Sequence, residues 1–493
     1  SIHPGHLADN LSRMRIAEAS HRTALAGLAL YVIFAPHSVA ASAIAIGIAG
    51  LGWLFRTATS RRLGLQRTKF DLIILCLLVW TIASSLLSVE PLISIAKLKA
   101  SWCVFIFYLA RAILTKRTAL FLVALLIASG AAGTLYSVYD IARGRGVVVT
   151  AVGPNSPFTA VGVSANDTIW RVDGKRVYST SGIDEVLHSL PPNSVVSVSI
   201  ISRGEHIERP GLQVTPLLQT QSTPSGIAAG GRSHRFRASG WTRHYETFAE
   251  VLQMIAQVAL GLALAHLRNH GFNKTFRVAL PATLVLVTGI VLTAMRTVLL
   301  AFVCGAFVIA WRSTRLAARV AVTFALFFLL AFGAAVVWQT RAPTALLLGD
   351  DSSSLRGQVA RVGLSRIMIH PVFGHGMDAM HEHWQEWGFP GNDMLHLHST
   401  PLQLAFDRGL PMLAFWLWLM IAFWIYISRV EKNARNRSDT NSYGILLGIL
   451  GALTGFLISS LVNYNYGDSE AVMLFWCLMG IALVVGENRT ETV

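Results

Sequence analysis

Long apolar runs alternate with short polar segments along most of the chain, and this pattern predicts an all-α polytopic membrane protein. A helix that crosses a bilayer needs roughly 20 apolar residues, and fewer when long polar side chains flank it. We therefore expect about twelve transmembrane helices, the first two joined as a hairpin through Pro36 and His37. The predicted spans lie near residues 23–37, 38–55, 70–88, 99–115, 118–139, 246–267, 277–294, 296–311, 317–338, 410–428, 443–463 and 469–486.

Positive charge marks every second loop between these helices. The basic loops lie near residues 13–22, 56–69, 111–117, 268–277, 312–319 and 429–437. In membrane proteins the cytoplasmic loops carry the excess of Lys and Arg. Because the alternation holds along the whole chain, we expect these loops and both termini to be cytoplasmic, and the other loops to face outward. Residues 1–20 are polar, so we expect no cleavable signal peptide there.

The outward loops differ in length and divide the chain into five predicted regions. These are the first five helices (1–142), an inserted soluble module (143–216), helices six to nine with outward segments that carry arginine (217–338), a large helical outward loop (339–409) and the last three helices (410–493).

The composition agrees with a membrane protein, because 53% of the residues are hydrophobic and only 14% are charged. The 41 Lys and Arg residues outnumber the 26 Asp and Glu residues. They stand singly at helix ends and in short loops, which indicates topology signals and contact with membrane lipids, and excludes a nucleic-acid-binding patch. The four cysteines lie within apolar runs, so the sequence predicts neither a disulfide framework nor a CxxC metal site.

The inserted module has the pattern of short strands and turns. Residues 146–152 alternate as a strand does, and residues 183–188 form a short amphipathic helix. This order resembles a bacterial PDZ domain, whose members bind an extended peptide by strand addition. The resemblance implies a peptide or protein partner, and a spacer role without a peptide is the alternative. The matching residues are Ser156-Pro157-Phe158, Val161-Gly162-Val163, Asn166-Asp167-Thr168-Ile169 and the predicted hairpin turn at Val172-Asp173-Gly174.

His398 stands where the last long outward loop meets a predicted helix. Thr400-Pro401 is typical of a helix start, with Ser399 or Thr400 as the cap. An imidazole in this place can accept a proton near neutral pH, and a plain polar contact is the alternative. A lone charge in the tight turn at Met295-Arg296 is costly unless it faces protein, water or an anion. Arg296 is therefore either an anion contact or a snorkelling anchor.

A set of short motifs, all predicted to face outward, resembles the O-antigen ligase/polymerase (Wzy_C) family, most closely its O-antigen ligases. The motifs are Arg237-Ala238-Ser239-Gly240, Met295-Arg296, Ser354-Leu355-Arg356, Pro371-Val372-Phe373-Gly374-His375-Gly376, and His398-Ser399 with Gly409 after nine further residues. The chain departs from the family pattern at Met295, which replaces a Ser, at Leu410-Pro411-Met412, and in carrying a PDZ-like insert. The resemblance covers most of the chain outside the insert and implies a GT-C-like arrangement of helices.

The resemblance implies a glycosyltransferase that uses no nucleotide sugar, metal or other cofactor. Its donor would be a glycan on undecaprenyl diphosphate and its acceptor lipid A-core, at the periplasmic face of a Gram-negative inner membrane. We expect Arg296 and Arg356 to hold the diphosphate, because guanidinium binds phosphate oxygens bidentately. We expect His398 to take the acceptor proton in an inverting displacement. Further substrate contacts are expected from Arg235, Arg237, Arg341, His396 and Ser399.

Other functions fit parts of the same pattern. A polymerase that extends lipid-linked repeats, or a ligase that transfers the glycan to protein, would share these motifs. A polysaccharide or lipid transporter or flippase would favour ionisable residues at mid-membrane and internal repeats, and neither is evident.

Two further groups of residues in the outward loop each leave two interpretations open. The pairs His381/His383 and His396/His398 suit either a metal site or histidines at a wet interface, and we expect no metal. Their neighbours suit either stacking on sugar faces or an aromatic belt at the membrane surface. These neighbours are Trp384, Trp387 and Phe389.

Overall fold

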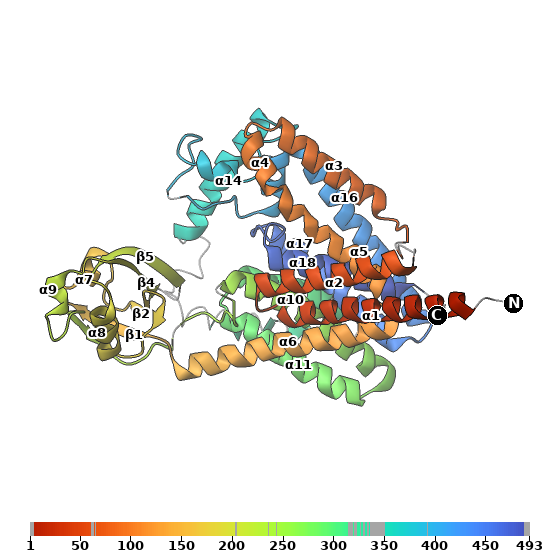
Figure 1. The fold of residues 1–493 in the computed structure, drawn as a ribbon, viewed down its shortest axis with the longest axis horizontal. Coiled ribbons are helices and arrows are strands. Elements are labelled where there is room, and N and C mark those ends of the chain that lie inside the picture. The colour runs from red at the N-terminus through yellow and green to blue at the C-terminus, as the bar shows by residue number, and fades with distance from the viewer. Residues whose placement is uncertain are drawn as a thin grey trace.

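The structure is a computed structural model. It describes residues 4–487 apart from 61–63, 65, 203–204, 235, 243, 392 and most of 314–350. Figure 1 shows a bundle of long helices with a small β-sheet domain beyond one end of it. The predicted span at 317–338 falls largely outside the described residues.

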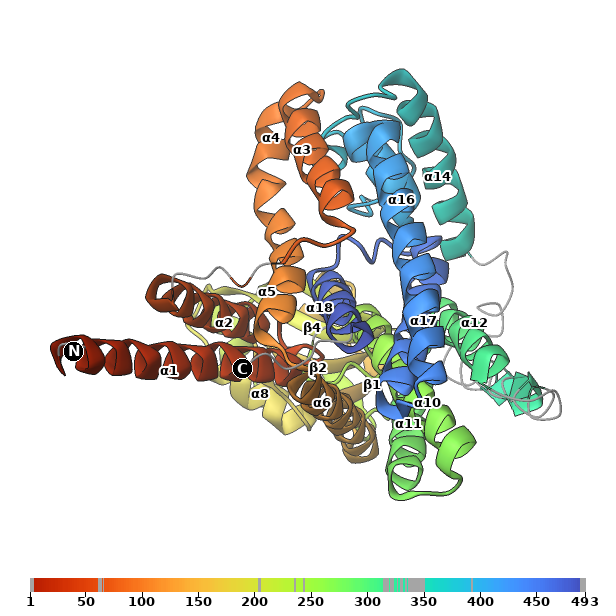
Figure 2. The same ribbon diagram turned by 90° about the vertical axis from the view of Figure 1, so that its right-hand side faces the viewer.

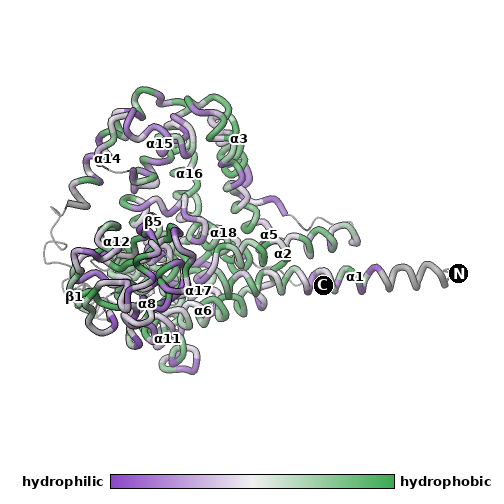
Figure 3. Tube along the Cα trace, turned by 60° about the vertical axis from the view of Figure 1, so that its left-hand side comes forward, coloured by the Kyte–Doolittle hydropathy of each residue, from purple (hydrophilic) through white to green (hydrophobic). Residues whose placement is uncertain are grey.

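The bundle confirms the predicted polytopic all-α architecture. Within the described part of the chain, nine helical segments are long and apolar enough to cross a membrane, and the shorter α3 (Asp71–Leu87) is also apolar. Figure 3 shows hydrophobic residues along these helices. The nine are α2 (Val39–Ser60), the continuous α4, η1 and α5 (Pro91–Lys97, Leu98–Val104, Phe105–Ile113), α6 (Lys116–Arg143), α10 (Tyr245–His270), α11 (Lys274–Leu292), α12 (Arg296–Ser313), α16 (Thr400–Asn436), α17 (Thr440–Ser460) and α18 (Ser469–Gly486).

Helices α10, α17 and α18 form the centre of the bundle. In the most apolar stretch of each, 83% or more of the residues are buried, against 33% in α2. Glycines let the backbones approach closely, since a Cβ on Gly261 would lie 2.4 Å from Gly448 N, and one on Gly448 2.5 Å from Val258 Cα. Gly27 and Gly52 do the same between α1 (Pro4–Phe34) and α2, which form the predicted hairpin.

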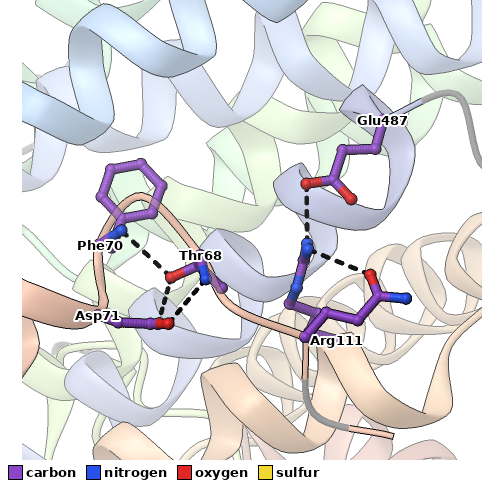
Figure 4. Close-up of polar contacts among 6 residues, drawn as sticks. Thr68, Phe70, Asp71, Arg111 and Glu487 are labelled. Atoms are coloured by element: carbon purple, nitrogen blue, oxygen red, sulfur yellow. Dashed lines mark hydrogen bonds and ion pairs between the residues drawn. The ribbon is translucent and has the colours of Figure 1, made fainter.

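The end of the bundle opposite the β-sheet domain is held together by charged and polar side chains. Arg111 donates to Glu487 at 3.0 Å and to Gln66 at 3.5 Å. Figure 4 shows Arg111 pointing towards Glu487. Beside it the Thr68 amide donates to the Asp71 carboxylate at 2.7 Å, which holds the start of α3. Other cations of the basic loops have partners at this end: Lys116 with Asp439, Arg268 with the Ser313 carbonyl, and Arg312 with Glu431. The predicted basic loops therefore gather at one end of the helices.

The β-sheet domain interrupts the bundle between α6 and α10. Its sheet is antiparallel with the order β5-β4-β2-β1-β6, and β3 pairs with β2. Asp173 and Gly174 have φ values of 49° and 72°, which makes the predicted two-residue hairpin turn between β2 and β3. The elements are β1 (Val147–Val152), α7 (Pro157–Ala160), β2 (Thr168–Val172), β3 (Lys175–Arg176), α8 (Thr180–Ser189), β4 (Val195–Ser202), β5 (Glu205–Gln213), α9 (Pro216–Gln219) and β6 (Ile227–Ala229).

The loop that is predicted to face outward is fixed to the bundle at a break in α16. Gly409 has φ 81° and ψ 170°, and a Cβ there would lie 1.8 Å from the Val372 carbonyl oxygen. The turn at residues 371–376 takes up backbone groups that the break leaves open. The hydrogen bonds run from His375 N to Phe406 O (2.8 Å), from Gly376 N to Asp407 O (2.9 Å) and from Leu410 N to Pro371 O (2.7 Å). The turn at residues 371–376 and the segment from His398 to Gly409 therefore pack directly against each other.

Helix α14 (Asp351–Ile369) lies alongside the first part of α16 (Figure 2), and the short α15 (Ala379–Glu382) follows it. Between them is a small apolar core that includes Trp384, Trp387 and Phe389, which are 3%, 7% and 3% exposed. Both interpretations of these aromatics from the sequence are therefore wrong. They neither stack on a ligand nor form a belt, because they fill the interior of the loop.

We expect Gly409→Ala to destabilise the protein. The added methyl group would meet a carbonyl oxygen, and a positive φ costs an L residue about 1–2 kcal/mol. In a chain of 493 residues a loss of about 1 kcal/mol corresponds to roughly 1 °C, so the melting temperature in detergent should fall by at least about 1 °C. Gly357→Ala in α14 is the matched control, because its Cβ would meet no atom within 4 Å. Equal melting temperatures for the two variants would contradict this role of Gly409.

Candidate active site

A cavity of about 960 Å³ lies where the β-sheet domain meets the bundle. The β-sheet domain supplies one part of its lining, with Arg145, Trp170, Arg171 and Arg176. The bundle and its loops supply the rest, which includes Tyr136, Trp241, Tyr245, Glu246, Glu250, His396, His398, Asn463, Tyr464 and Asp468. The cavity therefore forms only when segments that are distant in the sequence fold together.

His396 and His398 reach this cavity because Leu397 between them points the other way. Leu397 is buried against α14, where Gly363 leaves room for it, and its amide donates to Gln403 Oε1 at 2.7 Å. The two imidazole centroids lie 4.3 Å apart, and His398 has a φ of 51°, a conformation uncommon outside glycine.

Burial and positive charge keep His398 uncharged. Desolvation is the largest cause that lowers the pKa of His398 from 6.5 to about 3, and the charges of His396 and Arg356 lower it further. Burial and Arg356 also lower the pKa of His396. Arg356 belongs to α14, the helix against which Leu397 packs. The His398 imidazole is therefore neutral at pH 7 and able to accept a proton.

Asn463 connects the start of α16 with the start of α12. Its carbonyl oxygen accepts hydrogen bonds from Thr400 N and Thr400 Oγ1, each at 3.1 Å. Its side-chain amide donates to Thr297 Oγ1 at 3.2 Å. Because Thr297 follows Arg296 and Thr400 comes two residues after His398, this network fixes Arg296 relative to His398.

Ser399 and Thr400 begin α16 as predicted, with Pro401 in the first turn. Among the described contacts, however, the Ser399 side chain makes no capping hydrogen bond. The Thr400 hydroxyl instead donates to Asn463 O and to Asn465 Oδ1 at 3.0 Å. Ser399 is buried and is absent from the described lining of the cavity. The structure therefore gives Ser399 a place in the helix start rather than in the cavity wall.

The segment that carries Arg237 lies against the turn that carries Arg296. Ala238 N donates to Leu292 O at 3.0 Å, and residues 293–295 lead from there to Arg296. Arg237 is 4% exposed, and its guanidinium lies 4.0 Å from the ring centroid of Tyr245, which lines the cavity. The described lining contains none of Arg237, Arg296 and Arg356. Arg237 and Arg296 are each held beside a residue that does line it, Tyr245 and Asn463 respectively. Arg235 and Arg341 lie outside the described residues.

The second histidine pair of the outward loop has carboxylate partners. His381 pairs with Asp393, and His383 pairs with Glu90 at 2.9 Å and with Glu386 at 2.7 Å. In the described parts of the chain, no three His, Cys, Asp or Glu side chains are placed to hold a metal ion.

The sequence analysis missed the part of the cavity wall that comes from the β-sheet domain. The Arg171 guanidinium lies 4.1 Å from the Trp170 ring centroid, and that of Arg145 lies 5.4 Å from it. Arg171 and Arg176 are directly opposite each other in the β2–β3 hairpin. Like charges that lie opposite one another destabilise a sheet. The Asp173-Gly174 turn sets the register of the hairpin, so the sequence alone could have shown that Arg171 and Arg176 face each other. Such an unfavourable pair is a signal of a functional surface.

We expect Asn463→Ala to lower the melting temperature by about 1–3 °C. The change removes the hydrogen bonds to Thr297 and to Ser459 and leaves buried groups unsatisfied, at a cost of about 1–3 kcal/mol. Asn269→Ala is the control. It removes one hydrogen bond, to Thr440, near the C-terminal end of α10. A loss no larger than that of the control would contradict the connecting role of Asn463.

Comparisons with known proteins identify two parts of the chain. Residues 281–417, which include Arg296, Arg356, His398 and Gly409, match the family model Wzy_C, described as O-antigen ligase. Residues 129–208 match the model of a PDZ domain. The magnetosome formation protease MamE of Magnetospirillum gryphiswaldense is 27% identical over 90 residues, which are 18% of this chain, and the chain spans only about a tenth of that protein's length. The chain is therefore a multi-pass membrane protein with a domain of the O-antigen ligase family and an inserted PDZ domain.

Proposed function

We propose that this protein is an O-antigen ligase that transfers a glycan from undecaprenyl diphosphate to lipid A-core, at the periplasmic face of a Gram-negative inner membrane. The family match supports glycosyl transfer of the ligase or polymerase type. The observation that carries the proposal is a cavity of about 960 Å³ lined by His396 and His398. The segment of these histidines packs through Leu397 against α14, the helix that carries Arg356. This cavity lies at the end of the helices opposite the basic loops, and basic loops are typical of the cytoplasmic side.

In the proposed reaction an acceptor hydroxyl oxygen attacks C1 of the donor sugar. The new C1–O bond forms as the bond from C1 to the phosphate oxygen breaks, and undecaprenyl diphosphate leaves with the electron pair. His398 takes the proton of the attacking hydroxyl as general base. A bound diphosphate would raise the pKa of His398 from its low value, because a nearby negative charge favours the imidazolium. Substrate binding would thus make His398 a stronger base.

Arg296 and Arg356 hold the diphosphate in this proposal, and Arg237 supports them. A guanidinium stays charged at any physiological pH and binds phosphate oxygens in a fixed geometry. The negative charge that develops on the leaving group makes such contacts stronger in the transition state. Hydrogen bonds from Ala238 to Leu292 and from Asn463 to Thr297 support this arrangement. Arg235 and Arg341 remain predicted substrate contacts.

The cavity walls would bind the sugars next to the reacting centre. Sugar hydroxyls need both hydrogen-bond donors and acceptors, and carboxylates, amides and guanidinium groups provide them. Glu246 and Asp468 line the bundle side, and Arg171, Arg176 and Glu208 line the PDZ side. His396 belongs to the same wall. A direct, inverting displacement needs no group beyond those named here.

We expect His398→Ala to lower transfer by about 10²–10⁴-fold without unfolding the protein, because a general base contributes that much. The measurement is a gel of surface lipopolysaccharide from cells that carry the variant, together with the pool of lipid-linked polymer. Loss of the polymer ladder while the lipid-linked polymer accumulates supports the ligase. A core that carries a single repeat indicates a polymerase instead.

His381→Ala is the matched control for this experiment, since His381 lies in the same loop and contacts Asp393. It should leave the ladder unchanged. An unchanged ladder in folded His398→Ala would contradict the proposal and favour another acceptor or transport.

We expect Arg356→Gln to move the acid limb of the pH–rate profile to higher pH. Arg356 lowers the pKa of His398, so its removal lets that pKa rise towards 6.5. The variant base then becomes protonated, and inactive, at a higher pH than in the wild-type protein. The profile of kcat/KM in detergent, with a lipid-linked donor, measures this change. An unshifted acid limb, with a reduced rate at every pH, would mean that Arg356 acts without electrostatic contact to His398.

A further inference from the structure

The PDZ domain carries a strand that lies beyond its own sequence match. The match covers residues 129–208, whereas β6 (Ile227–Ala229) comes after β5 and α9. In the sheet order β5-β4-β2-β1-β6, β6 pairs with β1 alone. Without β6, β1 would be an open edge of the sheet. PDZ domains commonly bind an extended peptide as an added strand at such an edge.

Backbone hydrogen bonds occupy this edge of β1 along its length. Val149 pairs with Ala229 and Val152 with Ile227, in antiparallel register. The further bonds run from Gly230 N to Val148 O (2.8 Å), from Val148 N to Gly231 O (3.1 Å), from Gly153 N to Gly226 O (2.9 Å), from Arg145 N to Ser233 O (2.8 Å) and from Ser233 N to Arg145 O (2.9 Å). A second peptide therefore finds the backbone groups of β1 already paired.

The side chains of the same segment fill the space between β1 and α8. Ile227 and Ala229 pack against the core of the PDZ domain, whereas Ala228 between them is exposed. Ser225 N donates to Asp184 Oδ1 on α8 at 2.8 Å. Anchors at alternate positions, together with main-chain bonds to an edge strand, are how a peptide ligand is recognised by strand addition.

We propose that residues 225–233 are the peptide ligand of the PDZ domain, bound in cis, and that this contact fixes the segment carrying Arg237. The chain itself tethers this ligand to the PDZ domain, and a short tether gives a ligand an effective concentration of roughly mM. A free peptide of the same sequence must exceed that concentration to replace it. The PDZ domain is therefore an internal clamp rather than an open receptor.

The chain continues from the clamped strand directly into the candidate site. Phe236 is buried, and the Arg145 guanidinium lies 4.7 Å from its ring centroid. Arg237 then lies over Tyr245, and Gly240 N donates to Ser137 Oγ at 3.0 Å. Release of β6 would free one end of this segment, so the clamp keeps Arg237 in place. That the clamp supports catalysis through Arg237 rests on the proposed function. That β6 occupies the edge of β1 does not rest on it.

The test uses the full-length protein in detergent and two variants whose added carboxylates point to opposite sides of β6. Ile227→Glu/Ala229→Glu places carboxylates against the PDZ core and should expel β6, whereas Ala228→Glu places one in solvent and should not. The probe is a fluorescein-labelled peptide with the sequence of residues 223–234. Fluorescence anisotropy should show roughly 10²-fold tighter binding to the double variant than to the wild-type protein and to Ala228→Glu.

A second measurement does not depend on whether the double variant folds. In Val149→Cys/Ala229→Cys the two residues are directly opposite, so mild oxidation of the otherwise wild-type chain should crosslink them. No crosslink, or equal peptide binding by wild type and double variant, would overturn the cis ligand.

A measurement of glycan transfer by the three proteins then tests the clamp and the proposed function independently. Lost transfer in the double variant and retained transfer in Ala228→Glu support the clamp. Equal transfer in all three proteins would overturn the clamp on Arg237. If the crosslink forms but even the wild-type protein transfers no glycan, the proposed function fails and the cis ligand stands.

Discussion

The break in α16 at Gly409 is the constraint on which the rest of the site depends. Backbone groups that are freed at the end of a membrane helix must find partners, because few water molecules are there to satisfy them. Here the turn at residues 371–376 supplies those partners and approaches so closely that only glycine fits. The contact fixes the outward loop over the bundle. This contact also determines where the first helical turn of α16 lies, and with it the position of His398 just before that turn.

The PDZ domain takes part in the same assembly. Its strand edge is occupied by the chain's own residues, and its β2–β3 hairpin reaches the cavity with Arg171 and Arg176. A module that usually recognises other proteins thus becomes, in this chain, a wall of the site and a support for the segment that carries Arg237.

The sequence was informative where a property is local or periodic. Apolar runs predicted the spans, and the spacing of His396 and His398 marked these two residues as a pair. The pattern at Ser399-Thr400-Pro401 predicted the start of α16, although Thr400 rather than Ser399 makes the side-chain contacts. The aromatics at 384–389 were misread, because a Trp in a polar loop has the same local pattern whether it is exposed or covers a core.

The sequence by itself determined the membrane helices, the inserted domain and the residue types able to bind a diphosphate and accept a proton. Only the tertiary structure decided which of them meet. Asn463, Trp170 and the β6 strand owe their positions to contacts with segments far away in the chain, and no local pattern encodes such contacts. The neutral state of His398 was also decided there, because desolvation depends on everything that packs around the imidazole and not on its neighbours in sequence.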